Sequence, residues 1–92
     1  MNTSIKLSLS DIRMMILCEY PLSTEEYGHC YYDGDGVTKS LEEAYVWYHV
    51  AQCAGNHRVD SLVSHLDSKF IKSTSIKLSS KAKHIYTRAL QC

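Results

Sequence analysis

Apolar residues recur at helical spacing through most of this 92-residue sequence, and little interrupts them. One proline and four glycines punctuate the chain, which leaves room for long helical segments. The pattern is clearest at 58–70 and 80–91, where apolar residues follow the i, i+3, i+4 spacing of one helix face. The residues are Val59, Leu62, Val63, Leu66 and Phe70 in the first segment, and Ala82, Ile85, Tyr86, Ala89 and Leu90 in the second. The sequence therefore predicts a helix in each segment.

Three further helices are predicted nearer the N-terminus, at 10–19, 24–32 and 41–54. Each has a recognisable start or stop, because capping residues satisfy free backbone groups and proline or glycine ends a helix. These signals are Tyr20-Pro21, the capping boxes Ser23–Glu26 and Ser40–Glu43, the turn Asp33-Gly34-Asp35-Gly36, and Gly55-Asn56. Together the five segments predict an all-α fold.

The segment 41–54 is apolar over more than half of the helix circumference. Only the strip Glu42, Val46, His49 and Cys53 is left over. A helix with so wide an apolar arc is usually covered on more than one side. We therefore expect this helix to lie between neighbours on two sides.

Two local patterns allow other interpretations. Asp-Gly is a strong hairpin turn, so a β-hairpin at 31–37 is the alternative to the second helix. The spacing of Asp33 and Asp35 is similar to that of a calcium-binding loop, but Val37 and Ala44 stand where oxygen ligands are required, which excludes that site.

The pentapeptide Ser-Ile-Lys-Leu-Ser occurs at 4–8 and again at 75–79, each time before an expected helix start.

Length and composition indicate one small globular domain spanning 1–92. Apolar residues make up 45% of the chain and charged residues 22%, which excludes a disordered or collagen-like chain. No apolar stretch is long enough to span a membrane, and the start lacks the pattern of a signal peptide. We therefore expect no membrane partner, a cytoplasmic location and reduced thiols at the four cysteines.

The stretch 27–56 resembles a Sel-one-like repeat, a relative of the tetratricopeptide repeat. Nine positions match the family pattern in one register. They are Gly28, Tyr31, Gly34, Gly36, Val37, Ala44, Trp47, Ala51 and Gly55. Three positions depart from it: Tyr27 replaces the usual Leu, Ser40 the usual Asp, and Gln52 the second Ala of a pair.

The resemblance implies a short αα-superhelix, or solenoid, of stacked antiparallel helix hairpins with about five helices. In this arrangement 24–56 is the full repeat, 58–91 is a C-terminal capping helix pair, and 10–19 stands in for the second helix of a preceding repeat. Gly28, Ala44 and Ala51 would let helices lie close together, and Trp47 would fill the gap between repeats. Gly34 and Gly36 would allow positive φ in the turn between the two helices. Arrays of about three repeats are usual, so flanking caps or a second copy of the chain must complete the stack.

The family typically acts as a non-enzymatic protein-binding scaffold, whose first helix in each repeat lines a concave surface. Glu25, His29 and Tyr32 lie together on that helix, off its apolar stripe. We therefore expect these three residues to contact a protein or peptide partner.

The residues that could suggest catalysis or metal binding are better explained as ordinary surface or core residues. His49, Cys53 and His57 are four apart, but Gly55 is expected to end the helix before His57. His29 and Cys30 are adjacent and point about 100° apart on a helix, so they cannot form a nucleophile pair. We expect no enzymatic activity, no metal and no cofactor.

Charge is divided unevenly along a chain whose net charge is zero. Residues 1–46 carry three basic and eight acidic side chains, a net charge of −5, and residues 47–92 carry seven basic and two acidic, a net charge of +5. Such a molecule can associate head to tail, so a homo-oligomer is one expectation. Binding of nucleic acid or another anionic surface by the basic C-terminal helices is the less favoured alternative.

Overall fold

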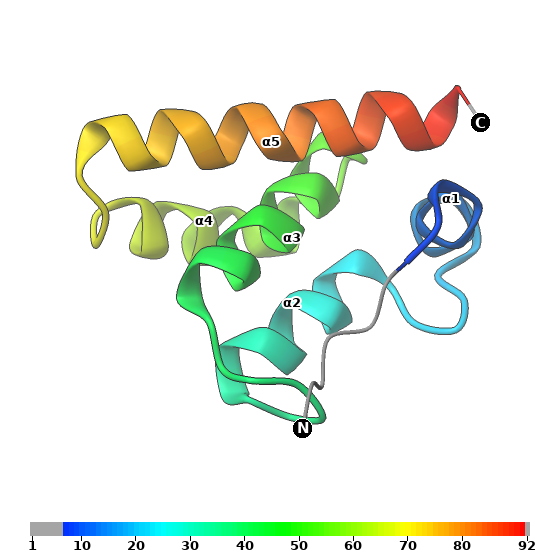
Figure 1. Cartoon of the computed structure of the whole chain (residues 1–92), viewed down its shortest axis with the longest axis horizontal. Helices are drawn as coiled ribbons and strands as arrows, with labels where there is room; N and C mark the ends of the chain where they lie inside the picture. The colour runs from blue at the N-terminus through cyan, green and yellow to red at the C-terminus, as the bar shows by residue number, and fades with distance from the viewer. Residues whose placement is uncertain (1–6, 92) are drawn as a thin grey trace.

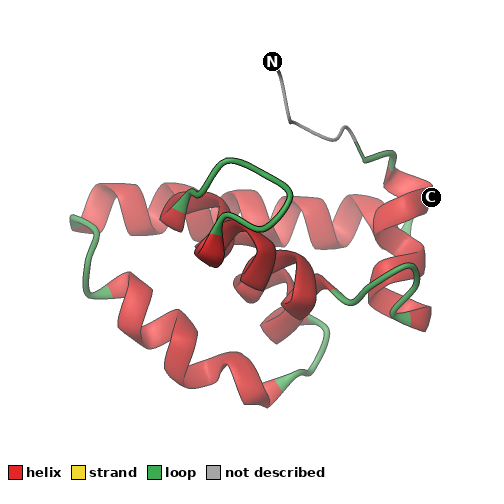
Figure 2. Ribbon diagram, turned by 90° about the horizontal axis from the view of Figure 1, so that it is seen from below, coloured by secondary structure: helices red, strands yellow, loops and turns green. Residues whose placement is uncertain are grey.

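The computed structural model describes residues 7–91 and contains five α-helices and one 3₁₀ turn (Figure 1). The elements are α1 (Leu9–Cys18), α2 (Thr24–Asp33), α3 (Leu41–Cys53), η1 (His57–Val59), α4 (Asp60–Asp67) and α5 (Lys72–Leu90). Residues 7–91 contain no strand, and Figure 2 shows only helices joined by loops. The predicted all-α fold with about five helices is confirmed, and the hairpin at 31–37 is excluded because α2 continues to Asp33.

Side-chain caps begin the first three helices. At α2 the predicted capping box is complete: the Glu26 amide donates to Ser23 Oγ at 3.1 Å, and the Ser23 amide donates to Glu26 Oε1 at 2.8 Å. Ser8 and Asp11 form the same arrangement at α1, which the sequence reading missed.

The predicted capping box at α3 is only half formed. Ser40 Oγ accepts a hydrogen bond from the Glu43 amide at 3.1 Å. The Glu43 carboxylate turns instead toward the helices that pack on α3, accepting from Trp47 Nε1 at 3.3 Å and lying 3.6 Å from Lys81 Nζ. Contacts between helices have taken the place of the reciprocal cap.

α3 is the central element of the molecule, because α2, α4 and α5 all pack against it. Every residue from Ala44 to Tyr48 is buried, as are Val50 and Ala51. We expected two neighbours and a leftover strip that included Val46, but Val46 is only 1% exposed. Three neighbours account for this difference.

Close packing between α2 and α3 depends on Gly28. An added Cβ at this position would lie 2.7 Å from two ring atoms of Tyr48, which is closer than Cβ atoms approach in real structures. The expectation that Gly28 allows two helices to approach closely is therefore confirmed. Gly34 and Gly36 adopt the positive φ expected of them, at 75° and 78°.

The fifth helix begins eight residues earlier than the sequence pattern predicted. It starts at Lys72 rather than Ser80, so the second copy of the pentapeptide, 75–79, lies inside α5 and not before its start. Leu78, in that copy, is buried in the core. The first copy lies largely outside the described residues.

The predicted helix 58–70 is shorter than expected. η1 precedes it, α4 ends at Asp67, and Phe70 lies beyond the helix but still packs on the core.

α5 runs across the molecule from the turn after α4 to α1 (Figure 1). It packs along α3 and also against α1, where Arg13 Nη1 donates to the Leu90 carbonyl at 3.4 Å. The main contacts of α4 and α5 are with α3 rather than with each other. The stacking of hairpins into a superhelix stays a prediction.

Candidate partner-binding surfaces

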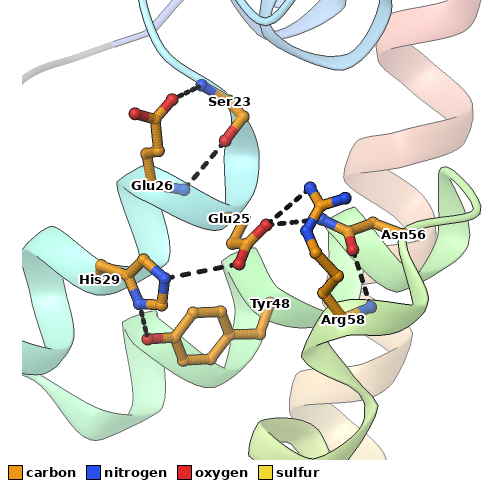
Figure 3. A network of polar contacts seen from close by, with 7 residues as sticks. All are labelled: Ser23, Glu25, Glu26, His29, Tyr48, Asn56 and Arg58. Atoms are coloured by element: carbon orange, nitrogen blue, oxygen red, sulfur yellow. Dashed lines mark hydrogen bonds and ion pairs between the residues drawn. The ribbon is translucent and has the colours of Figure 1, made fainter.

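Glu25, His29 and Tyr32 project from one face of α2, and the structure brings all three close to Tyr48 of α3. His29 Nδ1 lies 2.7 Å from Tyr48 Oη (Figure 3). The Tyr32 ring centroid is 6.5 Å from that of Tyr48. The predicted site residues therefore form one group, organised around a buried tyrosine.

Both carboxylate oxygens of Glu25 make contacts within the chain. Its Oε1 accepts hydrogen bonds from Asn56 Nδ2 at 2.8 Å and Arg58 Nη2 at 3.0 Å, and its Oε2 lies 3.5 Å from His29 Nε2 (Figure 3). The hydrogen bond from Asn56, followed by the guanidinium of Arg58, holds the pKa of Glu25 below its ordinary value. We call Glu25, His29, Tyr48, Asn56 and Arg58 the polar cluster. It fastens α2 to α3 and to the turn that follows α3.

Sequence reasoning missed three members of the polar cluster: Tyr48, Asn56 and Arg58. Tyr48 was assigned to the apolar arc of α3, although a buried tyrosine hydroxyl usually finds a hydrogen-bond partner. Asn56 was identified only as a stop signal. Its side chain also accepts from the Arg58 amide at 2.9 Å.

A separate pocket of about 350 Å³ lies between α3, α4 and α5. Its lining includes Tyr45, His49, Asp67, Phe70, Lys72 and Ile76. The rings of Tyr45 and Phe70 meet edge to face at 5.5 Å, and Tyr45 Oη donates to Asp67 Oδ1 at 2.9 Å. We call this the α3–α5 pocket.

Burial controls the chemistry of this pocket. Desolvation, with the hydrogen bond to Asp67, raises the pKa of Tyr45 to about 12. Desolvation also lowers the pKa of His49, and the nearby Lys83 lowers it further. The pocket therefore has neutral aromatic walls, with the Asp67 carboxylate bonded to Tyr45 and the ammonium of Lys72 also in its lining.

The thiols of Cys30 and Cys53 are poor nucleophiles. Cys53 Sγ lies 3.8 Å from His49 Nδ1, but burial raises the pKa of Cys53, so the thiolate is disfavoured. Burial and the negative charge of Asp35 raise the pKa of Cys30 as well. His29 bonds to Tyr48, and His57, beyond the end of α3, faces Asp60 at 3.3 Å. Residues 7–91 bring together no group of three His, Cys, Asp or Glu residues suited to a metal ion.

Exposed large apolar side chains lie in two places. Met14, Leu17 and Tyr20, on and just after α1, are 45%, 56% and 66% exposed. Ile71, at the N-cap of α5, is 71% exposed, and Ile76, which lines the α3–α5 pocket, is 56% exposed. Isolated exposed apolar residues are ordinary, but groups of them often mark interaction sites.

Comparison with known proteins gives no further guide: no protein-family model, curated protein or solved structure matches the chain. None of the helices within residues 7–91 combines the length and apolar character needed to cross a bilayer.

Proposed function

We propose that this chain is a non-enzymatic protein–protein interaction module of the Sel-one-like repeat type, acting in the cytoplasm. The observation that carries the proposal is the α3–α5 pocket, whose lining includes the exposed Ile76. Its volume of about 350 Å³ is at the low end of the range of about 300–1,000 Å³ found for small-molecule pockets. A pocket this small suits one or two apolar side chains of a partner protein.

The chemistry of the described residues supports binding rather than catalysis. The thiols of Cys30 and Cys53 have raised pKa values, and Asp67 is already bonded to Tyr45. The described cysteines, Cys18, Cys30 and Cys53, form no disulfide with one another.

The α2 surface with Glu25, His29 and Tyr32 is a second contact region in this proposal. The polar groups of Glu25 already have partners inside the polar cluster, which supports a structural role for that residue. His29 has a side chain that is 46% exposed and is the more available of the two. We therefore place the main contact at the α3–α5 pocket and an accessory contact at His29 and Tyr32.

Capture of partners from native cell extract tests this proposal. Immobilised wild-type chain should retain a defined set of proteins, and Ile76→Asp should lose them, because the substitution places a charge at the edge of the pocket. Thr87→Asp is the matched control, since Thr87 is an exposed residue near the other end of the same helix. Equal capture by wild type and Ile76→Asp would contradict binding at this pocket.

Nucleic-acid binding is a second candidate, favoured by the basic residues of α5. On a helix with 100° per residue, Lys72 and Lys83 lie on one side of the buried stripe, and Lys77, Lys81 and Arg88 on the other. Lys81 also pairs with Glu43 at 3.6 Å. A divided basic surface is less suited to one phosphate backbone. A DNA or RNA shift at low salt that disappears steeply with added salt would support this candidate, and no shift would remove it.

A further inference from the structure

The two groups of exposed apolar side chains lie at opposite ends of the molecule. α1, with Met14, Leu17 and the following Tyr20, is at the right of Figures 1 and 2. The turn between α4 and α5, which contains Ile71, and the start of α5, which contains Ile76, are at the left of both views. We call these the α1 surface (Met14, Leu17, Tyr20) and the α5 surface (Ile71, Ile76 and the α3–α5 pocket).

The outward face of α1 lacks the polar character of a helix that caps an array. Helical arrays remain soluble when their terminal helices present a polar outer face. Here the outward side of α1 carries Met14 and Leu17, while Ile12 and Met15 face the core. Two acidic residues flank this surface, because Asp11 and Glu19 are both exposed. The α1 surface is therefore apolar at its centre and acidic at its edges.

The α5 surface has the complementary character. Ile76 lines the pocket together with Tyr45 and Phe70, and the exposed Ile71 directly follows Phe70 in the chain. Lys69 and Lys72 are exposed beside Ile71, and neither makes an ion pair with another described residue. An apolar centre with a basic edge is what the α1 surface requires of its partner.

We propose that the α1 surface of one copy binds the α5 surface of a second copy, head to tail. This inference rests on the proposed function, of which it names the partner as the chain itself. Apolar side chains of α1 would enter the α3–α5 pocket, and Asp11 and Glu19 would lie near Lys69 and Lys72. The contact joins two different surfaces, so repetition produces a ring or an open chain of copies.

The size of the chain limits how strong this contact is. A standard specific interface covers about 800 Å² on each partner, which is about 14% of the 5701 Å² exposed by this chain. Few side chains are available at each surface, and their charges are screened by salt. We therefore expect association at micromolar concentration that becomes weaker as salt is added.

Two variants test the head-to-tail contact. Leu17→Asp removes the α1 surface and keeps the α5 surface, whereas Ile76→Asp does the reverse. Both side chains are 56% exposed, so both variants should fold, which circular dichroism checks. Light scattering should show each variant alone as a monomer. An equimolar mixture should form a dimer and no larger species, because only one intact pair of surfaces remains.

Thr87→Asp serves as the control and should associate as the wild type does. A wild type that stays monomeric into the high micromolar range would overturn the inference. So would association of either variant by itself, or a mixture that does not dimerise. If the wild type is monomeric yet captures other proteins through Ile76, the proposed function stands and self-association alone fails.

Discussion

At the scale of single residues, Tyr48 determines how α2 and α3 meet. Its ring is fully buried and lies directly against Gly28, and its hydroxyl bonds to His29 at 2.7 Å. One side chain thus joins an apolar contact to the polar cluster. Substitutions on either side of the ring test these two roles separately.

Gly28→Ala should destabilise the fold. Alanine favours a helix over glycine by about 1 kcal/mol, but overpacking typically costs about 1–3 kcal/mol. Because the added Cβ would lie 2.7 Å from the Tyr48 ring, we expect a net loss of up to about 2 kcal/mol in the free energy of unfolding, measured with urea. The cost should shrink in a Tyr48→Leu background, where the ring is absent. A Gly28→Ala variant as stable as wild type would contradict this packing.

Glu25 should make the stability depend on pH. The hydrogen bonds from Asn56 and Arg58 lower the pKa of Glu25 in the folded chain, below its ordinary value of 4.5. Its contribution is therefore fully present above about pH 4.5, and is lost as the pH falls through the lower pKa of the folded state.

Glu25→Gln should cost about 1 kcal/mol near neutral pH, since a hydrogen bond to a charged group is worth somewhat more and this one is partly exposed. Urea unfolding at several pH values should show the gap between wild type and Glu25→Gln closing in acid. Glu42→Gln, at an exposed residue of α3, is the control and should change stability by less than about 0.5 kcal/mol. A gap that stays constant down to acid pH would contradict the role of the Glu25 charge.

At this scale the sequence predicted the neighbours along α2 but not those across the fold. Glu25 and His29 are four apart, so helical spacing alone placed them together. Asn56 and Arg58 lie 31 and 33 residues from Glu25, and no local pattern links them to it. The polar cluster depends on how helices pack, which spacing within one helix cannot show.

At the scale of helices, the main difference between the sequence prediction and the structure is the start of α5. Residues 72–79 are rich in Ser and Lys, and Ile71 at the N-cap makes no side-chain hydrogen bond. Ser and Thr are weaker helix formers than Ala or Leu, so local preference favoured a later start. Burial of Leu78 against the core supplies what local preference lacks.

Proline at two positions of α5 tests this helix start. Ser80→Pro should cost about 3 kcal/mol or more, because Ser80 lies inside the helix and proline removes a backbone hydrogen bond there. Lys72→Pro should be tolerated, because Lys72 is the first helical residue and proline suits that position. Urea unfolding measures both. If the helix began at Ser80, both substitutions would be nearly neutral.

For the central helix α3, in contrast to α5, the local sequence pattern predicted the outcome. The wide apolar arc of α3 predicted correctly that this helix would be enclosed, because a helix that is apolar on most sides must be covered on those sides. Which helices cover it was beyond the pattern, since α2, α4 and α5 all offer an apolar stripe. Trp47 illustrates this limit. Trp47 was expected to fill a gap between repeats. In the structure its ring instead meets that of Tyr27, in the same helix hairpin, with the ring centroids 4.9 Å apart.

At the scale of the whole molecule, the two oppositely charged halves partly pair with each other. Glu25 of the acidic half meets Arg58 at 3.0 Å, and Glu43 meets Lys81 at 3.6 Å. Some of the opposite charges that suggested a partner therefore pair within one chain and hold its two halves together. Lys69 and Lys72, near the α3–α5 pocket, are among the exposed cations of the described residues that remain for a second molecule, together with Lys77, Lys83 and Arg88.

Alkaline pH should unfold the chain through its buried tyrosines. Burial raises the pKa of Tyr45 and Tyr48 to about 12, and that of Tyr27 further, from an ordinary value of 10.0. Each raised pKa means that the neutral hydroxyl stabilises the folded state, fully below pH 10 and less as the pH rises toward 12. Folding should therefore weaken over that interval.

Tyrosinate absorbance measured together with circular dichroism tests this expectation. A group of the seven tyrosines should ionise only as the helical signal is lost, whereas in concentrated urea all seven should ionise together near pH 10. Tyr45→Phe should remove one tyrosine from the late group, because its hydroxyl is the one bonded to Asp67. If all seven ionised in one step near pH 10 while the chain stayed helical, then Tyr27, Tyr45 and Tyr48 would not form the enclosed centre of the fold.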